Sequence, residues 1–152
     1  MKNTFALVGL AIAVFSFSSC EKNGNVNVQE IGYGTSFGMC VGYCMSDIAV
    51  NVNEVKFSKK KHGTNPEIKT CTKKMTEDEL NELNKLVNQH DFEKLPEVIG
   101  CPDCADGGAE WVALKMDDKI KKVTFEYGNA PNKLKNLVAK LKEIKESFKD
   151  CN

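Results

Sequence analysis

Two pairs of closely spaced cysteines are the residues of this chain best suited to chemistry. Cys101 and Cys104 form a Cys-x-x-Cys motif, and three residues separate Cys40 from Cys44. A Cys-x-x-Cys pair can exchange disulfides when a following helix lowers the pKa of its first thiol. Because glycines rather than a helical pattern follow Cys104, a structural disulfide is the favoured interpretation. A thiol-disulfide oxidoreductase that uses Cys101 and Cys104 is the alternative.

The same four cysteines have spacings that would also suit a tetrahedral zinc site of four thiolates. An exported protein meets an oxidising compartment, which favours disulfides over free thiolates, so we expect no metal and no other cofactor. Oxygen ligands occur in the second cysteine loop at Asp103, Asp106 and Glu110. Their spacing is not that of a calcium-binding EF-hand, and we expect a solvated acidic loop.

The first twenty residues predict an export signal followed by a lipidation site. Lys2 gives a basic start, residues 5–17 form an apolar run, and Ser18-Ser19-Cys20 resembles a bacterial lipobox. In this interpretation a signal peptidase cuts before Cys20 and its thiol is acylated, with palmitate among the expected chains. A plain secretory signal with a chance cysteine is the alternative.

The signal divides the chain into three parts. Residues 1–19 are the signal peptide, residues 20–28 are the lipidated cysteine and a polar tether, and residues 29–152 form one domain. The protein would be anchored in the bacterial cell envelope by its lipid. The tether lacks a cluster of acidic residues, which favours the periplasmic face of the outer membrane over the cell surface.

Cysteine counting agrees with an exported protein. The chain has seven cysteines, and acylation of Cys20 leaves an even number for up to three disulfides. The sequence does not decide how they pair. The disulfide candidates are Cys40, Cys44, Cys71, Cys101, Cys104 and Cys151.

The charge composition argues against nucleic acid as a partner. The chain has a formal net charge of zero, and all its basic residues are lysine. Arginine makes the bidentate contacts that dominate the reading of phosphate and of bases. Without arginine and without net positive charge, a nucleic-acid partner is not expected.

The first half of the domain reads as strands. We expect a strand over 28–35, the first cysteine loop, a hairpin, and a further strand over 67–73. Alternating apolar residues place the hairpin turn at Asn53-Glu54, which pairs Val52 with Val55 and Val50 with Phe57.

The second half begins with a helix after Thr76, which forms a capping box with Glu79. A second hairpin follows with its turn at Asp117-Asp118, and Pro131 stands near the start of a last helix. This order predicts an α+β fold: a two-layer sandwich with a mainly antiparallel sheet and both helices on one face.

The loop Ser36-Phe37-Gly38-Met39-Cys40-Val41-Gly42-Tyr43 resembles a motif of an uncharacterised family of secreted proteins and lipoproteins of Bacteroidota. Members typically show Cys-Phe-Gly-x-Cys-Pro-x-Tyr, then a hairpin, a helix, a second hairpin and a final helix that starts at proline. Ser36 and Val41 depart from that motif, so a partner cysteine at position 36 does not carry over. The resemblance implies location and fold, and it implies no activity.

The sequence contains no catalytic constellation, so we expect a binding or interaction module rather than an enzyme. The loops 36–44 and 97–110 would present a contact surface for an unknown protein or a small ligand. For Trp111, packing on the second face of the sheet is expected over ligand contact. The contact candidates are Phe37, Tyr43, Asp103, Asp106 and Trp111.

Overall fold

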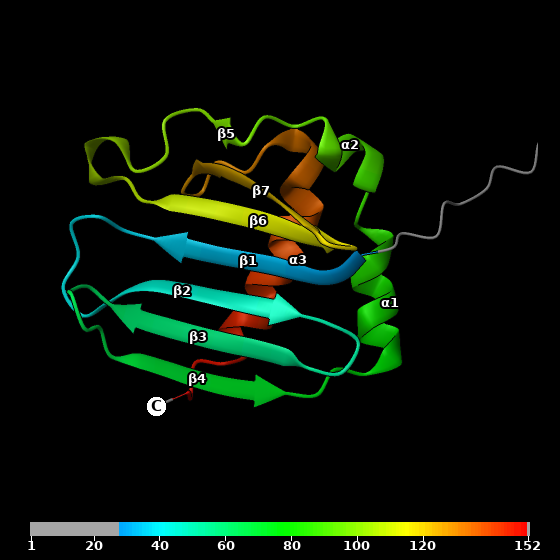
Figure 1. Cartoon of the computed structure of the whole chain (residues 1–152), viewed down its shortest axis with the longest axis horizontal. Helices are drawn as coiled ribbons and strands as arrows, with labels where there is room; N and C mark the ends of the chain where they lie inside the picture. Colours follow the sequence, from blue (N-terminus) through cyan, green and yellow to red (C-terminus); the bar gives the residue numbers. More distant parts are fainter. Residues whose placement is uncertain (1–27, 152) are drawn as a thin grey trace, which may run out of the picture.

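A seven-stranded mixed sheet and three α-helices make up the described part of the chain, which covers residues 28–151 of a computed structural model (Figure 1). The fold is therefore α+β, as the sequence predicts. The strand order is β4-β3-β2-β1-β6-β7-β5. The strands are β1 (Val28–Ser36), β2 (Tyr43–Val50), β3 (Val55–Lys61), β4 (Ile68–Lys73), β5 (Val98–Ile99), β6 (Ala109–Met116) and β7 (Lys119–Glu126). The predicted signal peptide, Cys20 and nearly all of the tether lie outside the described residues.

The first hairpin, β2–β3, has a different register from the one predicted. Val50 pairs with Val55, and Ile48 pairs with Phe57, so the expected pairs of Val52 with Val55 and of Val50 with Phe57 are wrong. Asn51 causes the difference, because its Oδ1 accepts hydrogen bonds from the backbone N–H groups of residues 53 and 54. This side-chain turn lengthens the connection to four residues and leaves Val52 exposed at its tip.

The second hairpin, β6–β7, confirms the turn predicted at Asp117-Asp118. Met116 pairs with Lys119, and Asp117 takes a positive φ of 50°, as tight hairpin turns require. β6 also pairs antiparallel with β1, which brings the two halves of the chain together in the centre of the sheet. Sequence reasoning missed β5, a two-residue strand that pairs parallel with β7 at the edge.

The helices begin largely where the sequence places them. The capping box of Thr76 and Glu79 is present at the start of α1 (Glu77–Lys85). A short helix, α2 (Gln89–Glu93), follows it. Pro131 precedes a 3₁₀ turn, η2 (Asn132–Leu134), that leads into α3 (Lys135–Glu146). No helix in residues 28–151 has the length and apolar character needed to cross a membrane.

One hydrophobic core joins the sheet and the helices. Buried side chains of α1, α2 and α3, such as Leu83, Phe92 and Leu141, share a single cluster with Ile31 and Val112 of the central strands. Figure 1 shows α3 behind the strands, and shows that the connections fall at two opposite ends of the sheet. The cysteine loops after β1 and before β6 lie at one end, while the turns at 51–54 and 117–118 lie at the other.

Candidate functional site

Both cysteine loops are closed by local disulfides. Cys40 pairs with Cys44, with their Cα atoms 5.6 Å apart, and Cys101 pairs with Cys104 at 5.5 Å. The predicted use of cysteine in disulfides is thus supported, and each loop is closed within itself. The remaining pair, Cys71 and Cys151, joins β4 to the end of the chain across 80 residues.

The two closed loops meet at one end of the sheet. We call residues 37–42 and 100–108 together the double loop. Asp103 joins them, because its Oδ1 accepts hydrogen bonds from the N–H groups of Gly38 and Gly108, both at 3.2 Å. The N–H of Asp103 in turn donates to the carbonyl of Gly108. One carboxylate therefore holds both loops, which is the role found for the predicted contact residue Asp103.

Aromatic and backbone contacts reinforce this junction. The ring of Phe37 meets the ring of Tyr127 edge-on at 4.9 Å between centroids. The carbonyl oxygen of Phe37 lies 2.9 Å from Nε2 of His62, which belongs to the β3–β4 connection. Gly108 has a positive φ of 81°, and a Cβ atom there would collide with the Phe37 ring. Close contact between the loops thus requires glycine at position 108.

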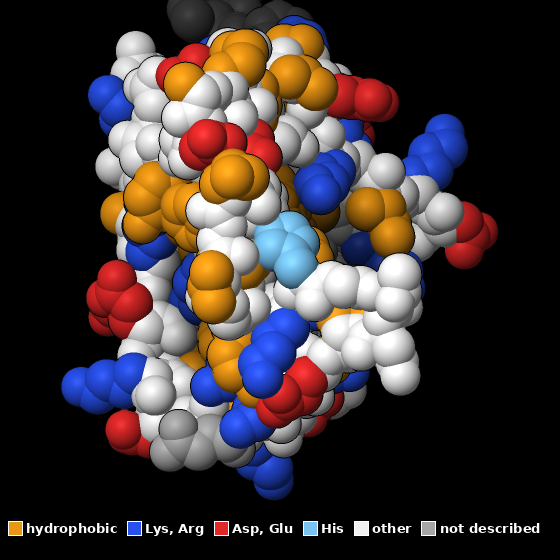
Figure 2. Space-filling model, turned by 90° about the vertical axis from the view of Figure 1, so that its left-hand side faces the viewer, with side chains coloured by type: hydrophobic (Ala, Val, Ile, Leu, Met, Phe, Trp, Pro, Cys, Tyr) orange, Lys and Arg blue, Asp and Glu red, His pale blue; other side chains and the backbone are white. Residues whose placement is uncertain are grey.

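Hydrophobic side chains project from the double loop into solvent. Met39 is 78% exposed and Val41 is fully exposed, on either side of Cys40. Tyr127, beside Phe37, is 48% exposed. Figure 2 looks onto this end of the molecule and shows hydrophobic side chains across it, interspersed with lysine and acidic side chains. Exposed apolar residues on a braced loop are suited to contact with a partner.

The other predicted contact residues lie in different settings. Tyr43 belongs to β2, where its hydroxyl donates to Oε1 of Glu67 at 2.6 Å. Loss of solvent and this hydrogen bond raise the pKa of Tyr43 to about 12. Asp106 is exposed in the second loop, with a positive φ of 58°.

Trp111 packs on the sheet rather than in the double loop. A Cβ atom added to Gly34 would lie 2.5 Å from its indole ring, and one added to Gly32 would lie 3.1 Å away. Because the two glycines have no side chains, the indole ring can lie directly on the backbone of β1. Nζ of Lys122 lies 4.5 Å from the ring centroid on the same face of the sheet. This placement agrees with the predicted packing role.

The Cys-x-x-Cys motif lacks the features that activate a thiol. Only a 3₁₀ turn, η1 (Cys104–Asp106), follows it, interrupted by a left-handed residue at Ala105. The N–H of Cys101 donates to Oε1 of Glu126 at 2.9 Å, and this bond lowers the pKa of that carboxyl. A carboxylate beside Cys101 disfavours a thiolate there, because like charges repel.

The expected acidic loop is only partly solvated. Within residues 28–151, no group of three or more His, Cys, Asp or Glu side chains is arranged to hold a metal ion. Glu110, grouped with Asp103 and Asp106 in the sequence, is fully buried in β6, so its expected place in a solvated loop is wrong. β6 begins one residue before it, at Ala109, and the strand turns its side chain toward α3.

The sequence did not predict a buried polar cluster around Glu110. Its Oε1 accepts from the hydroxyl of Tyr33 at 3.1 Å and from Nζ of Lys142 at 2.6 Å. One helical turn further, Nζ of Lys145 donates to Thr35 Oγ1 and Ser46 Oγ at 2.8 and 2.9 Å, and burial lowers the pKa of Lys145. The only available signal was the position of these lysines within the apolar spacing of α3.

Comparison with protein-family models finds no match for this chain, and comparison with curated proteins finds no significant relative.

Proposed function

We propose that this protein is a lipid-anchored binding module of the bacterial envelope, and that the double loop is its contact surface. The observation that carries the proposal is the exposure of Met39 and Val41 on a loop closed by a disulfide and joined to its neighbour by Asp103. A braced loop loses little conformational entropy on binding, and methionine adapts its shape to a partner. The partner chemistry that fits is a protein surface or ligand with an apolar recess.

The position of β1 supports an arrangement in which the double loop faces away from the membrane. The tether predicted from the sequence joins β1 at Val28, and the first cysteine loop follows Ser36 at the other end of the strand. Nine residues of strand span about 30 Å. A lipid on Cys20 would thus hold the protein by the end opposite the contact surface. We propose the periplasmic face of the outer membrane as the location, because the tether has no acidic cluster.

We infer a two-layer sandwich in which α1 and α3 cover one face of the sheet. Support comes from the single core that they share with the strands, and from the bonds of Lys142 and Lys145 to β1, β2 and β6. Membership of the Bacteroidota family suggested by the loop motif would agree with this element order.

Charge placed in the double loop tests the proposal. The variant M39D/V41D should lose the partners that co-purify with the wild-type protein after mild crosslinking of the envelope. The matched control is V52D/I120D, which changes an exposed apolar residue in the turn at 51–54 and another near the start of β7, both at the opposite end of the sheet. The control should keep every partner. If M39D/V41D keeps the same partners as the control, the double loop is not the contact surface.

The lipid anchor has its own test. Wild-type protein should incorporate radiolabelled palmitate in cells, and C20A should incorporate none while remaining exported as the unprocessed form. Equal labelling of C20A would contradict lipidation at Cys20.

A thiol-disulfide oxidoreductase is a second candidate, because Cys101 and Cys104 are paired and exposed. This function requires a reactive thiolate in the reduced protein. We expect instead that alkylation of reduced Cys101 follows a pKa at or above the ordinary value of about 8.5, owing to Glu126. Alkylation that follows a strongly lowered pKa would favour the enzyme.

The four-cysteine zinc site, an alternative from the sequence, is disfavoured by the disulfides that close both loops. Bound zinc in protein purified without a chelator would support it, and closed disulfides at both loops would exclude it.

A further inference from the structure

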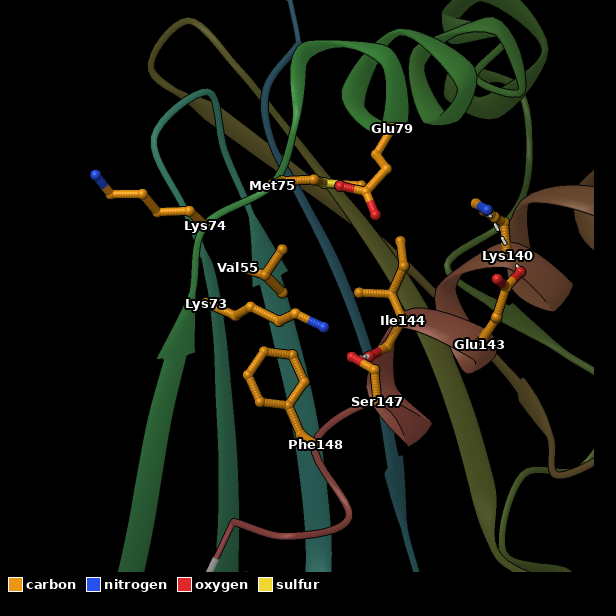
Figure 3. Close-up of a pocket in the computed structure, with 10 residues that line it drawn as sticks. All are labelled: Val55, Lys73, Lys74, Met75, Glu79, Lys140, Glu143, Ile144, Ser147 and Phe148. Atoms are coloured by element: carbon orange, nitrogen blue, oxygen red, sulfur yellow. Dashed lines mark hydrogen bonds and ion pairs between the residues drawn. The ribbon is translucent and has the colours of Figure 1, made fainter.

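A pocket lies at the end of the sheet opposite the double loop. It is bounded by the start of β3, the end of β4, the start of α1 and the second half of α3 with the residues just after it (Figure 3). Its cavity volume is about 100 Å³, and it opens to solvent. The lining residues are Val55, Lys73, Lys74, Met75, Glu79, Lys140, Glu143, Ile144, Ser147 and Phe148.

The floor of this pocket is apolar and well fixed. Val55 is 2% exposed and Phe148 is 8% exposed, and the ring of Phe148 stacks on Phe57 with 5.5 Å between centroids. Met75 and Ile144 are partly buried against the same core. A dry cavity of about 150 Å³ holds a benzene molecule, so this smaller open pocket suits a short alkyl chain.

The charges around the pocket are unbalanced. Oε2 of Glu79 accepts from the N–H of Thr76 at 2.8 Å, and the hydrogen bonds from Thr76, with the nearby Lys73 and Lys140, lower the pKa of Glu79 so that it carries its negative charge. Glu143 pairs with Lys140 at 3.4 Å. Figure 3 shows the ammonium of Lys73 reaching into the space between the strand and α3. Among the described residues, the side chains of Lys73 and Lys74 form no hydrogen bond or short ion pair. The lining holds three lysines against two glutamates, which leaves one positive charge in excess among the lining residues.

We propose that this pocket binds a small organic anion, a monocarboxylate with a short apolar tail. The tail would lie on Phe148, Met75 and Ile144, where burial of apolar surface stabilises it by about 25 cal/mol per Å². The carboxylate would accept hydrogen bonds from Lys73. Lysine acts here as a point charge, which suits a monoanion at an open site. This site is separate from the double loop and does not depend on its function.

The test uses hexanoate as the anion and 1-hexanol as its neutral counterpart, with binding followed by amide NMR shifts of the folded wild-type protein. Hexanoate should shift the amides of Met75, Ile144 and Phe148 saturably and more tightly than hexanol. K73Q should weaken hexanoate binding about fivefold. The matched control K56Q, on the neighbouring strand but pointing to the other face of the sheet, should leave binding unchanged.

The proposal would be overturned by hexanol binding as tightly as hexanoate, by unchanged hexanoate affinity in K73Q, or by the absence of saturable shifts up to the solubility limit of hexanoate. Inorganic phosphate should produce no saturable shift at these amides, because it has no apolar tail. Saturable phosphate binding there would identify a general anion site and would also overturn the assignment of a carboxylate ligand.

Discussion

The disulfide between Cys71 and Cys151 should contribute more to stability than either loop disulfide. A disulfide restricts the unfolded chain, and the effect grows with the logarithm of the loop it closes. The separation of 80 residues corresponds to about 4.5 kcal/mol, whereas the separation of 4 residues between Cys40 and Cys44 corresponds to about 2 kcal/mol. The variant C71A/C151A should therefore be destabilised by about 2.5 kcal/mol more than C40A/C44A.

The packing of Cys151 should increase the difference in stability between the two variants. Cys151 is only 5% exposed and belongs to the core cluster, and its carbonyl oxygen accepts a hydrogen bond from Nζ of Lys59. Loss of the disulfide frees the end of the chain and exposes this contact to fraying. The value of about 2.5 kcal/mol, which counts chain entropy alone, is thus a lower estimate of the difference in stability between the two variants.

Urea unfolding without reductant measures this difference in the free energy of unfolding. Both variants should unfold in one transition, with a clearly lower midpoint for C71A/C151A than for C40A/C44A. An equal or smaller loss of unfolding free energy in C71A/C151A would refute the reasoning. It would show that the unfolded chain already keeps residues 71 and 151 close together, or that the two cysteines are not paired.

Three further predictions follow from single contacts. Hydrogen bonds from Lys61 and Tyr43 lower the pKa of Glu67 to about 2, so the contribution of this carboxylate to stability is present above about pH 4.5 and is lost as pH falls toward 2. Y43F should raise the pKa of Glu67 in a carbon-13 NMR titration, and an unchanged pKa would contradict the hydrogen bond from Tyr43. E110A should lower the free energy of unfolding by about 3 kcal/mol, because it leaves two donors without their buried acceptor, and a loss below about 1 kcal/mol would argue against the cluster. G34A should lower the free energy of unfolding in urea by about 1–3 kcal/mol, because the added Cβ meets the ring of Trp111. The loss should be smaller when G34A is made in a W111A background, and an equal loss in both backgrounds would contradict the contact.

Local signals predicted much of the fold. The capping box at Thr76 and the turn at Asp117-Asp118 could be read from a few adjacent residues, and both are present. The turn after Asn51 was misplaced because hydrophobic alternation alone allowed Val52 to face the core. The amide of Asn51 satisfies two backbone N–H groups and thereby fixes a longer turn. Alternation is a weaker guide where a side chain can bond its own backbone.

The candidate site depends on long-range placement, which the sequence alone could not supply. The pairing of β1 with β6 brings residue 38 to residue 103, and only this pairing shows that the two cysteine loops meet. Glu110 was expected in solvent because a glycine-containing acidic segment precedes it, yet β6 begins at Ala109. Lys142, which pairs with Glu110, comes from α3, and its position within the apolar spacing of that helix was the only local sign of a buried partner.

Site-specific photocrosslinking in intact cells would show whether the double loop is a binding surface. A photoreactive amino acid would replace Val41 in the double loop or, as the matched control, Val52 in the turn at the opposite end of the sheet. Both positions are exposed, so general access of the crosslinker is comparable. We expect a discrete crosslinked product from position 41 and none from position 52. Crosslinks from position 52 alone, or none from position 41, would contradict a binding surface in the double loop.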